Sequence, residues 1–291
     1  MKSKKVLLIG NGINDVTASY TWGDLIKDLI SFAKSDRSII QGRKPFPLLY
    51  EEIYLKVAKG IDKKEIEFKN FIAKKIKALK PSNVHKKIMS LNFENLLTTN
   101  YDYCLESSIS TDNDYDNKGI IKESLYSVFR HTNANKSNIW HIHGEMRIAK
   151  TILLGYEHYS GMLQQMRNYI VSGTGDNYKS AKFPSLNFML RHNKVEYASW
   201  LDFFFKKEVH IIGLSLSFAE IDLWWLLTYR ARRKKRLPIN NQIYYYYPKS
   251  FEKRITDMLD LLQASDVITI SLDIQHSIKY YDEALDLILK T

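Results

Sequence analysis

Two histidines are the side chains best suited to chemistry in this sequence. His141 and His143 flank Ile142, so on a strand both imidazoles point to the same face. A histidine at the end of such a strand can act as a general base near neutral pH. Two imidazoles can also hold a metal ion, but no third ligand follows at a clear spacing, and no metal is expected. Core or capping histidines are the structural alternative.

A second motif, Leu96-Leu-Thr-Thr-Asn-Tyr-Asp102, runs from apolar residues into polar ones. Thr99, Asn100 and Asp102 would follow a buried strand, at the edge where open α/β sheets bind ligands. The alternative is a turn in which Asp102 caps the next helix. The local sequence favours neither interpretation.

The first strand of the chain is expected to end in Gly10, Asn11 and Gly12. Glycines let the backbone turn sharply and approach a ligand closely, and a helix N-terminus after such a turn offers free amides to phosphate. The dinucleotide pattern of three glycines is incomplete because Asp15 stands at the third position. An ordinary dehydrogenase site is therefore disfavoured.

A further apolar run, His210-Ile-Ile212, ends in Gly213, Leu214 and Ser215. The hydroxyls of Ser215 and Ser217 either bind a ribose or phosphate oxygen or cap the following helix. Four strand ends thus carry Gly, Asn, His or Ser at one expected sheet edge. That edge is the usual place for a nucleotide crevice.

The elements that position these residues are predicted from hydrophobic patterns. Continuous β-branched or aromatic runs indicate strands buried on both faces, and amphipathic segments lie between them. The alternation predicts an α/β fold with an open, doubly wound, mostly parallel, Rossmann-like sheet in a single domain, residues 1–291. Helical insertions are expected at about 35–90 and 160–205. The seven predicted strands are 5–10, 95–100, 139–144, 151–156, 209–214, 242–247 and 267–272.

Composition narrows the class of protein. The chain has 291 residues, 43 Lys and Arg against 32 Asp and Glu, a net charge of +11, and one cysteine, Cys104. One cysteine cannot form an intrachain disulfide or a four-thiolate zinc site. The N-terminal apolar run is too short for a signal peptide and no stretch suits a membrane span, so a cytoplasmic protein is expected. The cations of 230–236 suggest either nucleic-acid binding or a charged helix end.

The order of these motifs resembles the sirtuin-like superfamily, and in part the AbiH family of phage abortive-infection proteins. Sirtuins carry a Gly-Ala-Gly segment followed by a tryptophan, then Thr-Gln-Asn-x-Asp, His-Gly and Gly-x-Ser. The matching segments here are Gly10-Asn-Gly12 with Trp22, Thr98-Thr-Asn100-Tyr-Asp102, His143-Gly144 and Gly213-Leu-Ser215.

The resemblance implies roles for these residues around NAD. Asn100 would hold the nicotinamide ribose or the attacking water, Asp102 would orient the nicotinamide side, and His143 would be the general base, with His141 as its competitor. The resemblance further implies that the NAD-binding residues are Gly10, Asn11, Gly12, Trp22, Thr99, Gly213 and Ser215.

The sequence departs from the sirtuin pattern at the zinc ribbon, which needs four cysteines. Recognition of an acyl-lysine peptide is therefore in doubt, and the resemblance implies NAD cleavage with water as acceptor, as in anti-phage defence. It also implies a homo-oligomer or a partner such as an ATPase or a sensor. The alternatives are a nucleotide-binding regulatory subunit and a basic nucleic-acid-binding protein.

Overall fold

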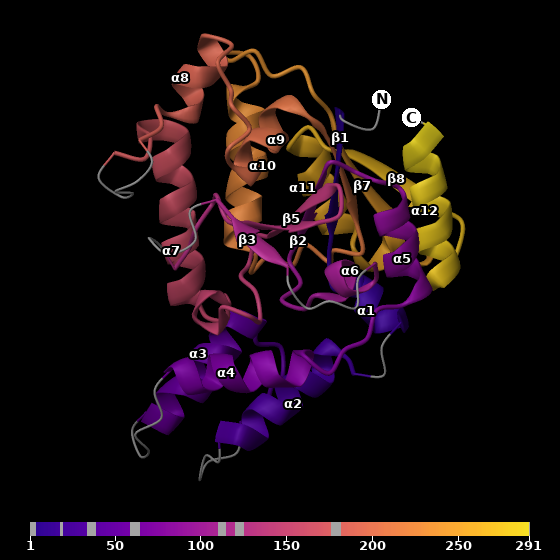
Figure 1. The fold of residues 1–291 in the computed structure, drawn as a ribbon. Coiled ribbons are helices and arrows are strands. Elements are labelled where there is room, and N and C mark those ends of the chain that lie inside the picture. The colour runs from indigo at the N-terminus through magenta and orange to yellow at the C-terminus, as the bar shows by residue number, and fades with distance from the viewer. Residues whose placement is uncertain are drawn as a thin grey trace.

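The computed structural model describes residues 4–17, 20–33, 39–58, 65–109, 115–119, 125–175 and 182–290. Its centre is an eight-stranded sheet in the order β3-β4-β5-β2-β1-β6-β7-β8 (Figure 1). The six strands from β5 to β8 in this order pair in parallel, and β3 and β4 add an antiparallel edge. The predicted open, mostly parallel α/β fold is confirmed. The strands are β1 (Lys5–Ile9), β2 (Asn95–Thr98), β3 (Asp116–Lys118), β4 (His131–Ala134), β5 (Ser137–His141), β6 (Glu208–Ile212), β7 (Ile243–Pro248) and β8 (Ile268–Leu272).

Six of the seven predicted strands are present, and the one predicted at 151–156 is wrong. The chain there leaves a 3-10 turn, η2 (Ala149–Thr151), and enters α7 (Tyr156–Arg167). Its backbone is satisfied outside any ladder, because Leu153 N–H donates to His143 O and Tyr101 Oη donates to Leu153 O. The short polar strands β3 and β4 had not been predicted. The Asn- and Asp-rich sequence at 112–117 predicts an exposed loop; residues 112–114 lie outside the described residues, and residues 116–117 belong to β3.

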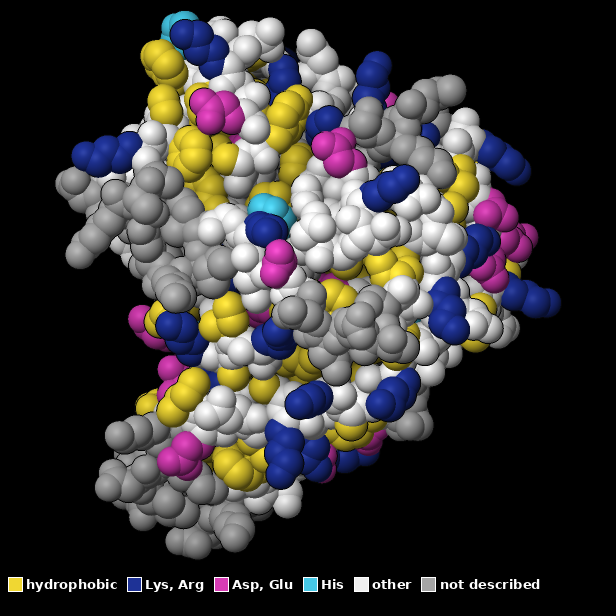
Figure 2. Space-filling model, in the orientation of Figure 1, with side chains coloured by type: hydrophobic (Ala, Val, Ile, Leu, Met, Phe, Trp, Pro, Cys, Tyr) yellow, Lys and Arg dark blue, Asp and Glu magenta, His cyan; other side chains and the backbone are white. Residues whose placement is uncertain are grey.

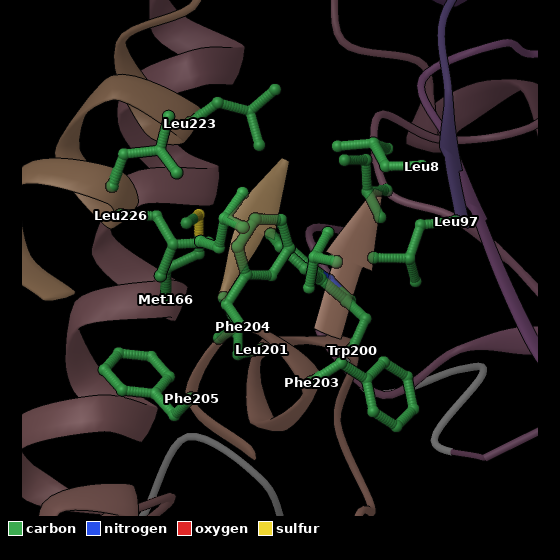
Figure 3. Packing of buried hydrophobic residues seen from close by; sticks show 14 of the residues in the cluster. Leu8, Leu97, Met166, Trp200, Leu201, Phe203, Phe204, Phe205, Leu223 and Leu226 are labelled. Carbon is green, nitrogen blue, oxygen red and sulfur yellow. The ribbon is translucent and has the colours of Figure 1, made fainter. Parts of the chain in front are cut away.

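Helices cover both faces of the sheet, as alternate residues of β1 require. Val6 and Leu8 pack on the face of α7, α9 (Trp200–Lys206), α10 (Ile221–Arg233) and α11 (Thr256–Ala264). Leu7 and Ile9 pack on the face of α5 (Asn83–Ser90) and α12 (Ile278–Lys290). Figure 3 shows the first core, in which aromatic residues of α9 and leucines of α10 meet Leu8 and Leu97.

A group of helices between β1 and β2 has a hydrophobic core of its own. This helical group consists of α2 (Trp22–Ala33), α3 (Phe46–Ala58) and α4 (Glu65–Ile76). In Figure 1 it lies at the lower end of the molecule, away from the N-terminus, where the parallel strands end. The remaining elements are α1 (Gly12–Thr17), α6 (Cys104–Ser107), η3 (Asn168–Ser172), α8 (Leu186–Arg191) and η4 (Lys249–Arg254).

On the face of the molecule drawn in Figure 2, basic side chains are spread out rather than gathered in one patch. Figure 2 shows Lys and Arg across one face, including several over the lower end that the helical group occupies. None of the described helices combines the length and the apolar character needed to cross a membrane.

Candidate functional site

A cavity of about 420 Å³ lies where the carboxyl ends of the parallel strands meet the helical group. Its lining comes from the segments after β1, β2, β5, β6 and β7 and from residues of α2 and α3, including Trp22 and Phe46. All the predicted site residues except Gly10 line it, namely Asn11, Gly12, Trp22, Thr99, Asn100, Asp102, His143, Gly213 and Ser215.

His143 lies two residues after β5 and is held by an acid from a distant helix. Its Nε2 is 2.9 Å from Oδ2 of Asp222, which is fully buried in the first turn of α10. Burial lowers the pKa of His143, but the Asp222 carboxylate outweighs burial and raises it above its ordinary value. Within the described chain, no residue hydrogen-bonds to His143 Nδ1. That nitrogen is therefore free to accept a proton in the cavity.

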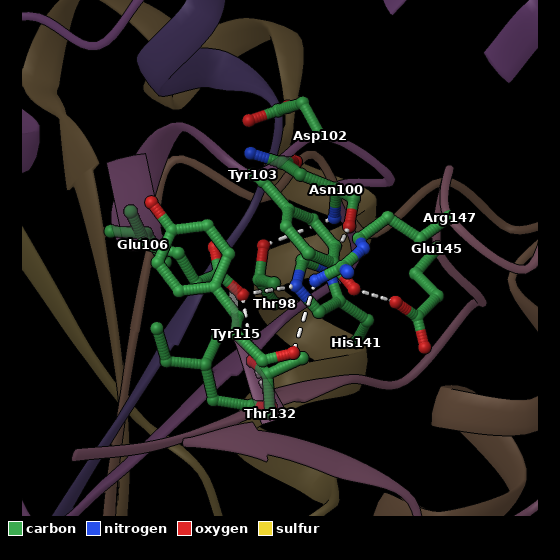
Figure 4. A network of polar contacts seen from close by, with 12 residues as sticks. Thr98, Asn100, Asp102, Tyr103, Glu106, Tyr115, Thr132, His141, Glu145 and Arg147 are labelled. Carbon is green, nitrogen blue, oxygen red and sulfur yellow. Dashed lines mark hydrogen bonds and ion pairs between the residues drawn. The ribbon is translucent and has the colours of Figure 1, made fainter. Parts of the chain in front are cut away.

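His141 is not part of the cavity lining. Its Nδ1 is 2.7 Å from Asn100 O and its Nε2 is 2.8 Å from Glu106 Oε1 (Figure 4). Glu106 also accepts a hydrogen bond of 2.7 Å from Thr132 Oγ1. The neighbouring carboxylate raises the pKa of His141 despite its burial. With both ring nitrogens occupied, His141 fixes the backbone at Asn100, and of the two histidines only His143 faces the cavity.

Asn100 presents an unsatisfied group to the cavity. Its N–H donates to Thr98 Oγ1 at 3.0 Å and its carbonyl faces His141, which fix the backbone on both sides. Its side-chain Oδ1 is buried without a hydrogen-bond partner. Because buried polar atoms are nearly always paired in native proteins, an orphaned amide oxygen on a cavity wall fits a ligand donor.

Asp102 has the capping role that the sequence had left open. One carboxylate oxygen accepts from Cys104 N–H at 2.9 Å, at the start of α6, and the other accepts from Asn14 Nδ2 at 2.8 Å. Asn14 also donates to Asn11 Oδ1 at 3.0 Å. This chain of contacts fixes Asn11 relative to the segment after β2. Both oxygens of Asp102 are thus engaged by the protein.

The glycines after β1 and β6 allow two backbone segments to touch. Gly12 N–H donates to Gly213 O at 2.8 Å, and a Cβ on Gly10 would stand 2.4 Å from the same oxygen. Gly213 has φ +62°, and a Cβ there would lie 2.6 Å from Tyr281 Oη. Gly10 faces this contact and does not line the cavity, and its expected role in NAD binding stays a prediction. The close packing of the two turns excludes a side chain at Gly10.

Two lining residues were missed as site residues from the sequence. Glu220, at the N-cap of α10, has its Oε2 buried without a partner, and burial raises its pKa to about 7. Arg254 follows β7 and supplies the single Lys or Arg side chain among the described residues of the lining. The sequence that follows β6 contains both Glu220 and Asp222, but its pattern indicates only a helix-capping role for Glu220. Their sequence distance from His143 hid their contact with it.

Two residues of the basic run 230–236 form ion pairs within the folded protein. Arg230 is fully buried and bonds Asp266 at 3.1 Å, and Lys234 reaches the same carboxylate at 2.6 Å. The run ends α10, where cations are favoured. The observed contacts support the helix-end interpretation and weaken the basis for a nucleic-acid surface.

No group of three or more His, Cys, Asp or Glu among the described residues is placed to hold a metal ion. A search of curated proteins returned no match to this sequence. The family model for the SIR2-like domain matches residues 94–257, which is more than half of the chain and spans Asn100, His143 and Asp222. The segment after β1 lies outside that match. With this match and a sheet of the same type, the chain belongs to the SIR2-like family, whose members are typically NAD-dependent enzymes.

Proposed function

We propose that the protein hydrolyses NAD at the bond between nicotinamide and ribose, releasing nicotinamide and ADP-ribose. The observation that carries the proposal is one cavity lined by both an orphaned Asn100 Oδ1 and a His143 imidazole held by Asp222. Its volume of about 420 Å³ falls in the range of small-molecule sites. The SIR2-like match supports NAD as the nucleotide.

The cavity residues supply what this reaction requires. Asn100 Oδ1 accepts a hydrogen bond from a ribose hydroxyl or from the attacking water. His143 keeps its Nε2 proton toward Asp222 and takes the proton of that water on Nδ1. Nicotinamide leaves as a neutral molecule, so no acid is needed for it. No thiolate zinc module is available from Cys104 alone, which favours water over an acyl-lysine peptide as acceptor.

The two ends of the lining suit the two halves of NAD. Trp22 and Phe46, whose ring centroids lie 4.7 Å apart, give an apolar wall beside Tyr101. Arg254 offers a cation to the diphosphate, and its guanidinium lies 4.2 Å from the Phe251 ring centroid. Gly12, Gly213 and Ser215 also line the cavity.

The test is to incubate the purified chain with NAD and to measure nicotinamide and ADP-ribose by chromatography. His143→Ala and Asn100→Ala should each abolish turnover without unfolding the protein, whereas His192→Ala, on an exposed histidine that forms no part of the lining, should not change it. Full hydrolysis by both site variants would remove the assignment. Nucleotide binding without products would favour the alternative of a regulatory subunit.

The biological setting that we propose is NAD depletion during anti-phage abortive infection, in the cytoplasm, by a homo-oligomer or with a defence partner such as an ATPase or a sensor. The support is the resemblance to AbiH-like and sirtuin-like defence proteins. Measuring NAD turnover with and without the proteins of the neighbouring operon tests this setting. An enzyme whose turnover is unaffected by any of them would argue against a partner.

A further inference from the structure

Glu220 is a carboxylate of the cavity lining that the mechanism above does not use. It lies between the loop after β6 and α10, and its Oε2 is buried without a partner. The backbone at Ser217 favours the charged form, but it is the smallest of the influences on the pKa of Glu220. It cannot neutralise the charge.

The groups packed around Glu220 come from several elements, and no Lys or Arg of the described chain acts on its pKa; His143 is its positive neighbour. Tyr101 follows β2, Tyr159 is on α7 and Tyr245 is on β7. Burial raises the pKa of all three phenols, and the Glu220 charge adds to the increase. Tyr101 Oη donates to Leu153 O at 2.6 Å and Tyr245 Oη to Leu214 O at 2.8 Å, so these hydroxyls are committed elsewhere. The charged neighbours of Glu220 are the members of the His143–Asp222 pair.

A carboxylate in such surroundings costs the fold free energy, because its charge loses water and the His143 imidazole beside it is already paired with Asp222. Its place on a substrate cavity makes it complementary to a positive charge brought by the ligand. NAD carries such a charge on its pyridinium ring, and the charge passes to the ribose as the bond to nicotinamide breaks.

We propose that the Glu220 carboxylate is a catalytic residue that stabilises the positive charge developing on the ribose. This inference rests on the proposed NAD hydrolysis. The electron pair of the C1′–N bond goes to nicotinamide, the water oxygen bonds to C1′, and the water proton passes to His143 Nδ1 and then to solvent. Glu220 gains and loses no atom. It acts through its charge alone.

The test compares Glu220→Gln, which keeps the shape and removes the charge, with the wild type. We expect kcat to fall about 10²–10³-fold, the usual effect of losing one electrostatic stabiliser. Glu220→Asp, which keeps a carboxylate, should retain more activity than Glu220→Gln. Glu252→Gln, on an exposed glutamate outside the lining, is the matched control and should leave kcat unchanged.

A second measurement separates charge from shape. NADH has a neutral dihydronicotinamide ring, so calorimetry in a His143→Ala background should show Glu220→Gln weakening NAD binding more than NADH binding. Equal effects on both ligands, or a kcat for Glu220→Gln within about threefold of the wild type, would overturn the inference and leave NAD hydrolysis standing. A wild type that leaves NAD intact would instead overturn the proposed function, and this inference with it.

Discussion

Replacing Glu220 by Gln should change the stability of the folded protein in a pH-dependent way that increasingly favours the variant as the pH rises. Burial raises the pKa of Glu220 from 4.5 to about 7, so between these values the folded state holds a proton that the unfolded state releases. The free energy of unfolding therefore falls as pH rises through this window and levels off above it. From this shift, the carboxylate costs about 3 kcal/mol at pH 8 and less than about 1 kcal/mol at pH 5.

Glutamine cannot titrate, so the variant escapes this cost. Its buried amide loses about 1–3 kcal/mol for want of partners, but that loss is the same at every pH. The difference in unfolding free energy between Glu220→Gln and the wild type should thus shift in favour of the variant by about 2 kcal/mol between pH 5 and pH 8. The pKa values of Asp202 and Glu145 are also raised to about 7, but these acids are present in both proteins and cancel.

Urea unfolding at the two pH values measures this difference directly, with Glu252→Gln as a control expected to show none. A pH-independent difference for Glu220→Gln would mean that a donor pairs the carboxylate in solution. The argument that Glu220 is an uncompensated charge would then be refuted, whatever the activity of the variant.

Three other changes test the remaining contacts. Asp222→Asn should lower kcat by about 10²–10⁴-fold and should lower the pKa of His143, which now gains from the carboxylate; an unchanged imidazole titration by NMR would contradict the pairing. Arg254→Ala should raise KM for NAD about tenfold, with little change in kcat and a weaker salt dependence; an unchanged KM would remove the diphosphate contact. Gly213→Ala should destabilise the fold by at least about 1 kcal/mol, because of φ +62° and the contact with Tyr281, and Tyr281→Phe should recover part of the loss in thermal unfolding.

The sheet was predictable because its strands are continuous apolar runs. The run after β5 misled the prediction, since Ile152 and Leu154 are apolar and fully buried without being in a strand. They pack into the core of the helical group, while side chains and loops satisfy the backbone around them. An apolar pattern reports burial and does not identify which partner provides it. Conversely, β3 and β4 carry polar residues such as Asn117 and Asn133 at the sheet edge and gave no such pattern.

Site residues that follow strands could be predicted from the sequence, whereas contacts between site residues that are distant in the sequence could not. His143 and Asn100 stand at strand ends, a position that spacing identifies. The acids that contact the two histidines are distant from them in the sequence. Asp222 is 79 residues from His143, and Glu106 is 35 residues from His141. Local sequence therefore left the choice between the two histidines open. The contacts separated them, because His141 has both nitrogens occupied and His143 has one.

The distribution of charge in the cavity indicates the order of charged groups in the ligand that it fits. The acceptor-rich part gathers the orphaned oxygens of Asn100 and Glu220 near the His143–Asp222 pair. Arg254 ends η4, which follows β7, and β7 stands four strand positions from β5. A ligand that complements both regions needs a positive, donor-bearing group at one end and an anionic group farther along. NAD has this order, with the pyridinium carboxamide at one end and the diphosphate beyond the ribose.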